Sequence, residues 1–173
     1  FWDQWVRYFV TRDAGFDSLS LDPQNPGAWA TRINDLTRLQ DINSTNLAAF
    51  NQRGGKLLMA HGTADVLVST RATAQYYERL KQTMGEAAVR NFARYYEVPG
   101  YGHAASTAFN ANWDSLKALD AWVTQGQAPT AQVVSDTAGV PGRTRPLCEY
   151  PSWPRYGGSG DVNKAESFSC VTN

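Results

Sequence analysis

The chain alternates amphipathic segments with two short strand-like runs. Residues 1–10 carry apolar side chains every three or four positions, which predicts a helix with a strongly aromatic face. Residues 57–60 are wholly apolar, as in a strand buried on both faces of a parallel sheet, and residues 93–98 predict a second strand. Residues 70–84 have helical spacing and join the two strands into a β-α-β unit. Three more helices are predicted. The first begins at Pro26 and has Trp29, Ile33 and Leu36 on its inner side. The second is capped by Ser44 and stopped by Gly54, and the third ends at Gly126 with an inner face of Leu116, Leu119, Trp122 and Val123.

This pattern predicts the fold class α/β, with part of the sheet missing from the sequence. At 173 residues and 42% hydrophobic, the chain has the size of one domain. Two parallel strands alone would leave unpaired edges and an uncovered aromatic helix, so we expect further strands from outside this sequence. We expect residues 1–130 to form the carboxy-terminal part of a larger core. Residues 131–173 lack periodicity and are predicted to be an irregular tail packed on that core.

Charge and apolar run length exclude two classes of partner. Sixteen basic and sixteen acidic residues cancel, so no overall field favours binding to nucleic acid or to an anionic membrane. The longest apolar stretch is only a few residues long and cannot span a bilayer. The first residues include neither an initiator Met nor a signal-peptide pattern, so we expect any export signal to lie upstream.

The two cysteines, Cys148 and Cys170, lie in the predicted tail, 22 residues apart. We interpret them as a disulfide rather than as two reduced thiols, since a tail with little apolar surface needs a crosslink. A disulfide indicates an oxidising compartment, so the chain is predicted to be secreted or periplasmic.

Two strand-to-turn junctions carry candidate chemistry. His103 follows the strand at 93–98 in a turn with Gly100 and Gly102, and Asp65 closes the turn after the strand at 57–60. An Asp that orients and a His that transfers protons are two members of a Ser-His-Asp triad. The alternatives are that Asp65 caps the helix that follows and that His103 is a turn residue bonded to backbone groups.

The nucleophile of such a triad is not recognisable in this sequence. The stretch Gly-Gly-Ser-Gly at 157–160 has no strand before it and no helix after it, unlike a G-x-S-x-G elbow. In α/β-hydrolases the triad follows the order Ser, Asp, His, so the last two strands supply Asp and His only. We therefore expect the carboxy-terminal portion of an α/β-hydrolase, with the serine and the oxyanion hole outside this chain.

Other candidate residues favour structural roles. His61 is interpreted as a packed or hydrogen-bonded structural histidine, whose loss would lower stability and leave kcat nearly unchanged. Asp161 and Asn163 resemble the start of a calcium loop, but the remaining ligands do not follow at the required spacing, so no metal or cofactor is expected in this chain. The aromatic residues Trp2, Trp5, Phe9 and Trp29 are expected to be core rather than the wall of a substrate pocket.

The tail carries a pattern of arginine, cysteine, tyrosine and glycine residues that resembles a known family. The pattern comprises residues 143–151 (Arg-Thr-Arg-Pro-Leu-Cys-Glu-Tyr-Pro) and 155–161 (Arg-Tyr-Gly-Gly-Ser-Gly-Asp), followed by Asn163, Ala165, Phe168 and Cys170. It resembles the carboxy terminus of the tannase and feruloyl esterase family, which includes the mono(hydroxyethyl) terephthalate hydrolases. Residues 53–65 and 98–103 resemble the family's segments before the catalytic acid and histidine, and the resemblance extends from about Tyr8 onward.

The resemblance implies an α/β-hydrolase with a lid inserted between the nucleophile strand and the acid strand. It implies hydrolysis of galloyl, hydroxycinnamoyl (such as feruloyl) or terephthalate esters, with Asp65 as the acid and His103 as the base. The partners would be a small aromatic ester and the remainder of the hydrolase. The lid, which commonly binds calcium in the family, would lie outside this sequence.

One position departs from the family pattern. Family members usually have Cys directly after the catalytic His, bonded to a Cys before the catalytic Ser, and this chain has Ala104 there. Three explanations stay open: a branch that holds the two loops together by packing, an altered position, or a decayed site. The alternative function is accordingly a non-catalytic fragment or pseudoenzyme that acts as a structural or binding unit.

Overall fold

The computed structural model describes residues 1–172, which divide into two compact units. The first unit is Phe1–Asn43, and the second begins at Ser44. The boundary expected between residues 130 and 131 lies inside the second unit. There the tail packs on the core, because Tyr150 N donates to Tyr95 O at 2.8 Å. Among residues 1–172 no helix is both long and apolar enough to cross a bilayer.

The first unit is helical, with a π-helical turn that changes its buried face. Helix α1, Trp2–Trp5, continues as the π-helix Val6–Thr11. Val6 and Val10 are fully buried, whereas Phe9, expected to point inward, is 49% exposed. A π-helix has more residues per turn than an α-helix, so the inward position moves from Phe9 to Val10. The unit also contains the 3₁₀ turns Ser18–Ser20 and Gly27–Trp29 and helix α2, Ala30–Gln40, with Leu21 and Leu36 buried and Trp5, Phe16, Trp29 and Ile33 packed against them.

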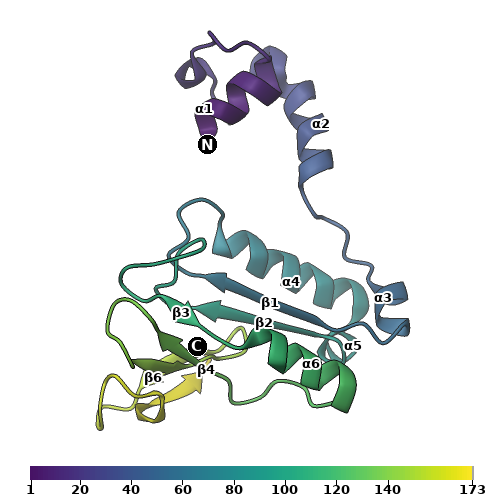
Figure 1. The fold of residues 1–173 in the computed structure, drawn as a ribbon. Helices are drawn as coiled ribbons and strands as arrows, with labels where there is room; N and C mark the ends of the chain where they lie inside the picture. Colours follow the sequence, from purple (N-terminus) through teal and green to yellow (C-terminus); the bar gives the residue numbers. More distant parts are fainter. Residues whose placement is uncertain (173) are drawn as a thin grey trace. The chain divides into compact units, whose positions relative to one another are not determined.

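Two parallel strands form the centre of the second unit. Strand β1, Leu57–Gly62, pairs in parallel with strand β2, Ala93–Val98. Helix α4, Thr70–Met84, covers one face of this pair, and helix α6, Ser115–Gln125, covers the other (Figure 1). The predicted β-α-β unit and the α/β class are confirmed. β1 is two residues longer than predicted, so His61 lies within the strand rather than after it.

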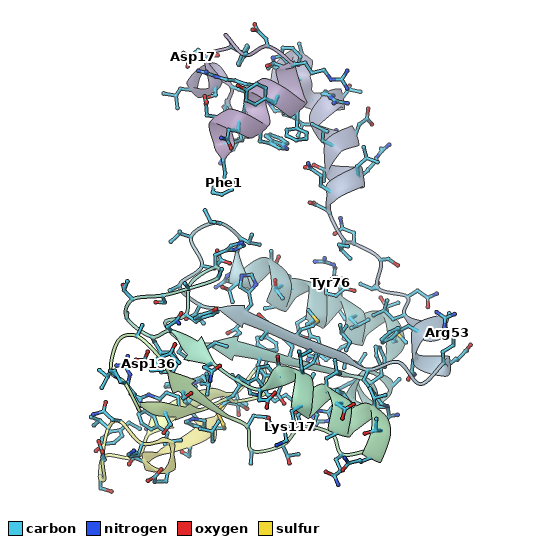
Figure 2. All side chains as sticks on the ribbon, in the orientation of Figure 1. Phe1, Asp17, Arg53, Tyr76, Lys117 and Asp136 are labelled. Atoms are coloured by element: carbon cyan, nitrogen blue, oxygen red, sulfur yellow. A yellow bond between two sulfur atoms is a disulfide. The ribbon has the colours of Figure 1, made fainter. Side chains whose placement is uncertain are left out.

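Apolar and aromatic side chains fill the two interfaces between helices and strands (Figure 2). On the α4 side, the ring centroids of Tyr77 and Tyr95 are 5.6 Å apart. On the α6 side, the guanidinium of Arg94 lies 5.0 Å from the ring centroid of Trp122. Arg94 is only 8% exposed, and its Nε lies 3.4 Å from the Glu149 carboxylate. That ion pair holds the tail at Glu149 against β2.

The shorter helices differ from the prediction at their ends. Helix α3, Ala48–Gln52, has Leu47 as its N-cap, not Ser44, and Asn46 Oδ1 accepts from the first helical N–H at 3.2 Å. Gly54 adopts φ 78° just after the helix, as predicted for a stop. Helix α5, Glu86–Arg90, was not predicted, because five residues are too few to show a periodic pattern.

Apart from α6, the region after residue 110 contains short strands joined by irregular segments. One antiparallel sheet has the order β3-β4-β5, and a second is the hairpin of β6 and β7. Strands of two to four residues are too short to show alternation in the sequence. Their bounds are Ala111–Asn112 for β3, Val133–Asp136 for β4, Thr144–Pro146 for β5, Trp153–Tyr156 for β6 and Phe168–Val171 for β7.

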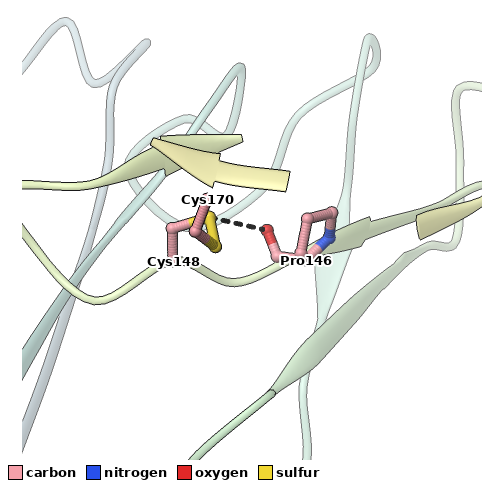
Figure 3. Close-up of a disulfide and its surroundings, with 3 residues drawn as sticks. All are labelled: Pro146, Cys148 and Cys170. Carbon is pink, nitrogen blue, oxygen red and sulfur yellow. Dashed lines mark hydrogen bonds between the residues drawn. A yellow bond between two sulfur atoms is a disulfide. The ribbon is translucent and has the colours of Figure 1, made fainter. Parts of the chain in front are cut away.

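A disulfide joins Cys148 and Cys170, the pair singled out in the sequence (Figure 3). Their Cα atoms are 5.5 Å apart, and Cys148 is 1% exposed. The bond ties β7 to the segment that follows β5. The hairpin of β6 and β7 is therefore crosslinked to the part of the tail that packs on β2.

Removing this crosslink should destabilise the second unit. For a separation of 22 residues, the chain-entropy model gives a loss of roughly 3 kcal/mol in the free energy of unfolding. We expect that loss in urea unfolding of the double variant Cys148→Ser, Cys170→Ser, and in the reduced wild type. Ser169→Ala, an exposed change on β7, is the matched control. A double variant as stable as the oxidised wild type would contradict the expectation.

Candidate active site

Asp65 lies in the turn after β1, and its carboxylate accepts hydrogen bonds from four donors. Its Oδ1 accepts from Leu67 N at 2.8 Å and from Val68 N at 2.9 Å. Its Oδ2 accepts from His61 Nε2 at 3.0 Å and from His103 Nδ1 at 2.9 Å. A carboxylate offers about four lone-pair sites, so its acceptor capacity is filled.

These contacts keep Asp65 ionised in a buried place. The side chain is 3% exposed, and burial alone would favour the neutral acid. The hydrogen bond from Val68 N, together with those from His103, Leu67 and His61, holds the pKa of Asp65 well below its ordinary value. Asp65 does not cap α4, because the N-cap of that helix is Ser69. The site therefore contains a permanent negative charge that faces two imidazoles.

The two histidines of the sequence differ in what their ring nitrogens can do. His61 uses both nitrogens, Nε2 on Asp65 and Nδ1 on Thr73 Oγ1 at 2.8 Å, and its side chain is 12% exposed. His103 uses Nδ1 on Asp65, its side chain is 51% exposed, and within residues 1–172 its Nε2 has no hydrogen-bond partner. His103 is therefore the histidine that can take a proton from an incoming hydroxyl.

The loops that carry Asp65 and His103 pack directly on each other. Ala64 N donates to Tyr101 O at 3.0 Å, and Gly100 N donates to Thr63 Oγ1 at 3.0 Å. A Cβ atom on Gly62 would lie 2.1 Å from Tyr101 O, so only glycine permits this approach. The acid and the histidine thus sit on one joined pair of loops.

A second buried carboxylate, missed in the sequence, anchors the far end of the His103 loop. Asp136 on β4 (Figure 2) has a fully buried side chain, and its Oδ2 accepts from Arg143 Nη2 at 2.6 Å. Its Oδ1 accepts from Asn110 N at 3.0 Å, and Asn110 Oδ1 accepts from Ser106 N at 3.1 Å. Ser106 Oγ in turn donates to Gly100 O at 3.1 Å. Asp136 also accepts from the backbone N–H groups of Ala138, Gly139 and Val140 at 2.7 to 3.0 Å.

A local signal could have found this anchor. Asp136 is followed within a few residues by Gly139 and Gly142, and an Asp before such a turn commonly accepts N–H groups from the backbone ahead of it. In the sequence the segment had no periodicity and was therefore assigned to an irregular tail.

A hollow of about 430 Å³ opens beside the Asp65–His103 pair. Val68, Tyr101 and Trp113 contribute apolar surface to its wall. The ring of Trp113 is held edge-on to Tyr96, with centroids 5.3 Å apart, and its Nε1 donates to Gln132 Oε1 at 3.0 Å. The hollow can accept a flat apolar group next to the exposed imidazole.

Neither the candidate serines nor the candidate metal ligands form a recognisable catalytic or metal-binding arrangement in the described residues. Ser159 lies in the connection between β6 and β7, not between a strand and a helix. Ser115 lines the hollow, but in the described part of the chain its hydroxyl makes no hydrogen bond to a histidine. Asp161 Oδ1 accepts from Asn163 N at 2.8 Å, which is a turn contact. Residues 1–172 contain no group of three or more His, Cys, Asp or Glu side chains placed to hold a metal.

Comparison with known proteins identifies the family. The family model described as "Tannase and feruloyl esterase" matches residues 2–171. The chain belongs to this family. An uncharacterized esterase of Agrobacterium fabrum is 40% identical over 170 residues, covering 97% of this chain and 31% of the relative. Mono(2-hydroxyethyl) terephthalate hydrolase of Piscinibacter sakaiensis is 46% identical over 134 residues, covering 74% of this chain and 22% of the relative.

A solved structure shows the same fold. Feruloyl esterase B from Aspergillus oryzae matches with a TM-score of 0.82 at 24% identity, covering 98% of this chain and 36% of that one. At this identity the likeness establishes the fold alone. The chain thus spans about a third or less of the length of the relatives named here.

The Asp136 anchor should make stability depend on acid pH. Burial raises the pKa of Asp136, but its backbone hydrogen bonds outweigh this and hold the pKa below the ordinary value of 3.8. Its stabilisation is therefore fully present above pH 3.8 and is lost progressively as the pH falls from there through the lowered pKa. Asp136→Asn replaces one carboxylate oxygen with an NH₂ group that faces N–H donors. We expect a melting temperature several degrees below wild type at pH 7 and a smaller difference near pH 3.

Asp120→Asn, at an exposed position on α6, is the control for loss of an ordinary carboxylate. Thermal melts from pH 7 to pH 3 measure the effect. A gap between Asp136→Asn and wild type that stays constant across this range would contradict the assignment.

Proposed function

We propose that this chain supplies the acid and the base of a Ser-His-Asp carboxylic ester hydrolase that acts on aromatic esters. The observation that carries the proposal is the 2.9 Å bond from His103 Nδ1 to Asp65, combined with an exposed Nε2 that is free within residues 1–172. The nucleophilic serine and the oxyanion hole come from a part of the protein outside this sequence. The family membership supports this division, since the chain spans only a part of its relatives.

The residues have defined roles in this mechanism. His103 Nε2 takes the proton of the serine hydroxyl while the serine oxygen bonds to the ester carbonyl carbon. The proton then passes to the leaving alcohol as the bond between the carbonyl carbon and the alcohol oxygen breaks and the acyl-enzyme forms. A water molecule then attacks the acyl-enzyme, with His103 Nε2 again taking and returning the proton. This step releases the carboxylic acid product and restores the serine. Asp65 keeps Nδ1 protonated and stabilises the imidazolium, which exists only between the two proton transfers.

The proposed substrates are feruloyl, galloyl or terephthalate esters. The names of the relatives support this class, because they include a terephthalate ester hydrolase and feruloyl esterases. The hollow beside His103 supports it too, because Tyr101 and Trp113 line it and aromatic rings stack or pack edge-on against such walls.

The remainder of the hydrolase is the proposed partner of β1. Within the described residues, β1 pairs with β2 on one edge only, which leaves the other edge for a strand that leads toward the serine. No cofactor is assigned to this chain, and a calcium ion would belong to the lid outside it. The disulfide supports a secreted or periplasmic location.

The isolated 173-residue chain should have no esterase activity. The assay uses methyl ferulate, methyl gallate and a p-nitrophenyl ester, with and without a serine-directed inhibitor. Turnover that the inhibitor abolishes would contradict the split triad. Ser115→Ala would then test whether the serine that lines the hollow is the nucleophile.

In the complete hydrolase, His103→Ala should lower kcat by about three orders of magnitude or more, because it removes the proton carrier. Asp65→Asn should lower kcat by up to roughly 10⁴-fold, because the amide favours the wrong imidazole tautomer. Melting temperatures check that both variants fold. Full activity in His103→Ala would refute the proposed function and favour a non-catalytic role for this chain.

A further inference from the structure

The structure assigns His61 as a positioning residue for the acid of the proposed triad. It fixes Asp65 Oδ2, the oxygen that orients His103, and Thr73 fixes His61 in turn. This inference rests on the proposed function. It replaces the purely structural role that the sequence suggested for His61.

The direction of each hydrogen bond follows from the chemistry of the carboxylate. Asp65 is ionised and can only accept, so both His61 Nε2 and His103 Nδ1 must carry hydrogen atoms. When His61 is neutral, its Nδ1 then has a lone pair, and the Thr73 hydroxyl donates to it at 2.8 Å. The carboxylate of Asp65 thereby selects the neutral tautomer of His61 with its hydrogen on Nε2, and the Thr73 hydroxyl holds the ring in that orientation.

His61 is better placed than His103 to define the position of Oδ2. It lies in the β1–β2 ladder opposite Glu97, and its ring is held by α4. Its side chain is 12% exposed, against 51% for His103 on the turn after β2. The two backbone donors hold only Oδ1, so the carboxylate can still swing about that oxygen. His61 removes this freedom and presents Oδ2 at a fixed place.

Loss of this donor should therefore affect turnover more than binding. In the complete hydrolase, we expect His61→Ala to lower kcat by about 10- to 100-fold with KM within about twofold of wild type, as for a catalytic group that is misplaced. His61→Gln, which can present an N–H near the position of Nε2, should recover part of the loss. Thr73→Val should lower kcat by a smaller factor, and Thr73→Ser should restore most of it.

Thr83→Val is the matched control for Thr73→Val. Thr83 lies on the same helix, and its hydroxyl is bonded to Thr45 Oγ1 at 2.8 Å rather than to a histidine. It should leave kcat unchanged. Melting temperatures of all variants separate loss of folded protein from loss of turnover, and rates are normalised to the folded fraction.

The outcomes distinguish this inference from the proposed function. If His103→Ala and Asp65→Asn are inactive while folded His61→Ala and Thr73→Val keep the wild-type kcat, the positioning role is wrong and the proposed function stands. If His61→Ala does not fold, Thr73→Val decides, because it leaves the imidazole in place. Equal losses in His61→Gln and His61→Ala at equal stability would also overturn the inference. Activity in His103→Ala removes the basis of both.

Discussion

The arrangement of this site depends on one saturated carboxylate. Asp65 is 3% exposed and accepts hydrogen bonds from two backbone N–H groups and two imidazoles. A buried charge with fewer hydrogen-bond donors would cost free energy of folding. All four donors are therefore needed to keep Asp65 ionised in this place. The requirement extends outward: His61 needs β1 and α4, and His103 needs the turn after β2. The position of the acid thereby fixes how the end of the parallel strand pair must be built.

Two buried carboxylates hold the two ends of the His103 loop. Asp65 holds the imidazole at one end of the loop, and Asp136 holds the backbone at Asn110 at the other. Family resemblance suggests a cysteine after the catalytic histidine, where this chain has Ala104. Here Tyr101 OH donates to Ala104 O at 2.7 Å, and the links through Ser106 and Asn110 fix the following turn. These contacts fix the turn that follows His103. They do not choose among the three explanations for Ala104, because those concern a link to the loop before the serine.

Sequence reasoning placed the helices and strands where periodicity is strong, but it put Leu116 and Val123 on the inner face of α6, and they are 79% and 57% exposed. It also failed where contacts are tertiary. The helix at 70–84, the strand at 93–98 and the stop at Gly126 follow from local patterns. Strand β1 was predicted to end at Ala60, because the next residue is polar, yet the ladder with β2 continues to Gly62. That error placed His61 outside the strand and concealed its hydrogen bond to Asp65. Asp136 was missed for another reason: four of its five donors follow it closely, at residues 138–140 and at Arg143, in a turn that shows no periodic pattern. The fifth donor is Asn110 N of the His103 loop.

Asp65 and His103 are brought together at the end of one β-α-β unit, and the Asp136 anchor holds the loop that carries His103. Asp65 and His103 are 38 residues apart in sequence, and the strands that carry them are direct neighbours in the ladder. In the proposed mechanism, the imidazole would be oriented before the serine approaches, and Asp65 would need no reorganisation as charge develops on His103. With Asp65 and His103 already in place, the proposed triad needs one more distance to be set, the one from the serine oxygen to His103 Nε2. In the proposed complete hydrolase, that distance is set by how the nucleophile strand and its neighbours dock on the free edge of β1.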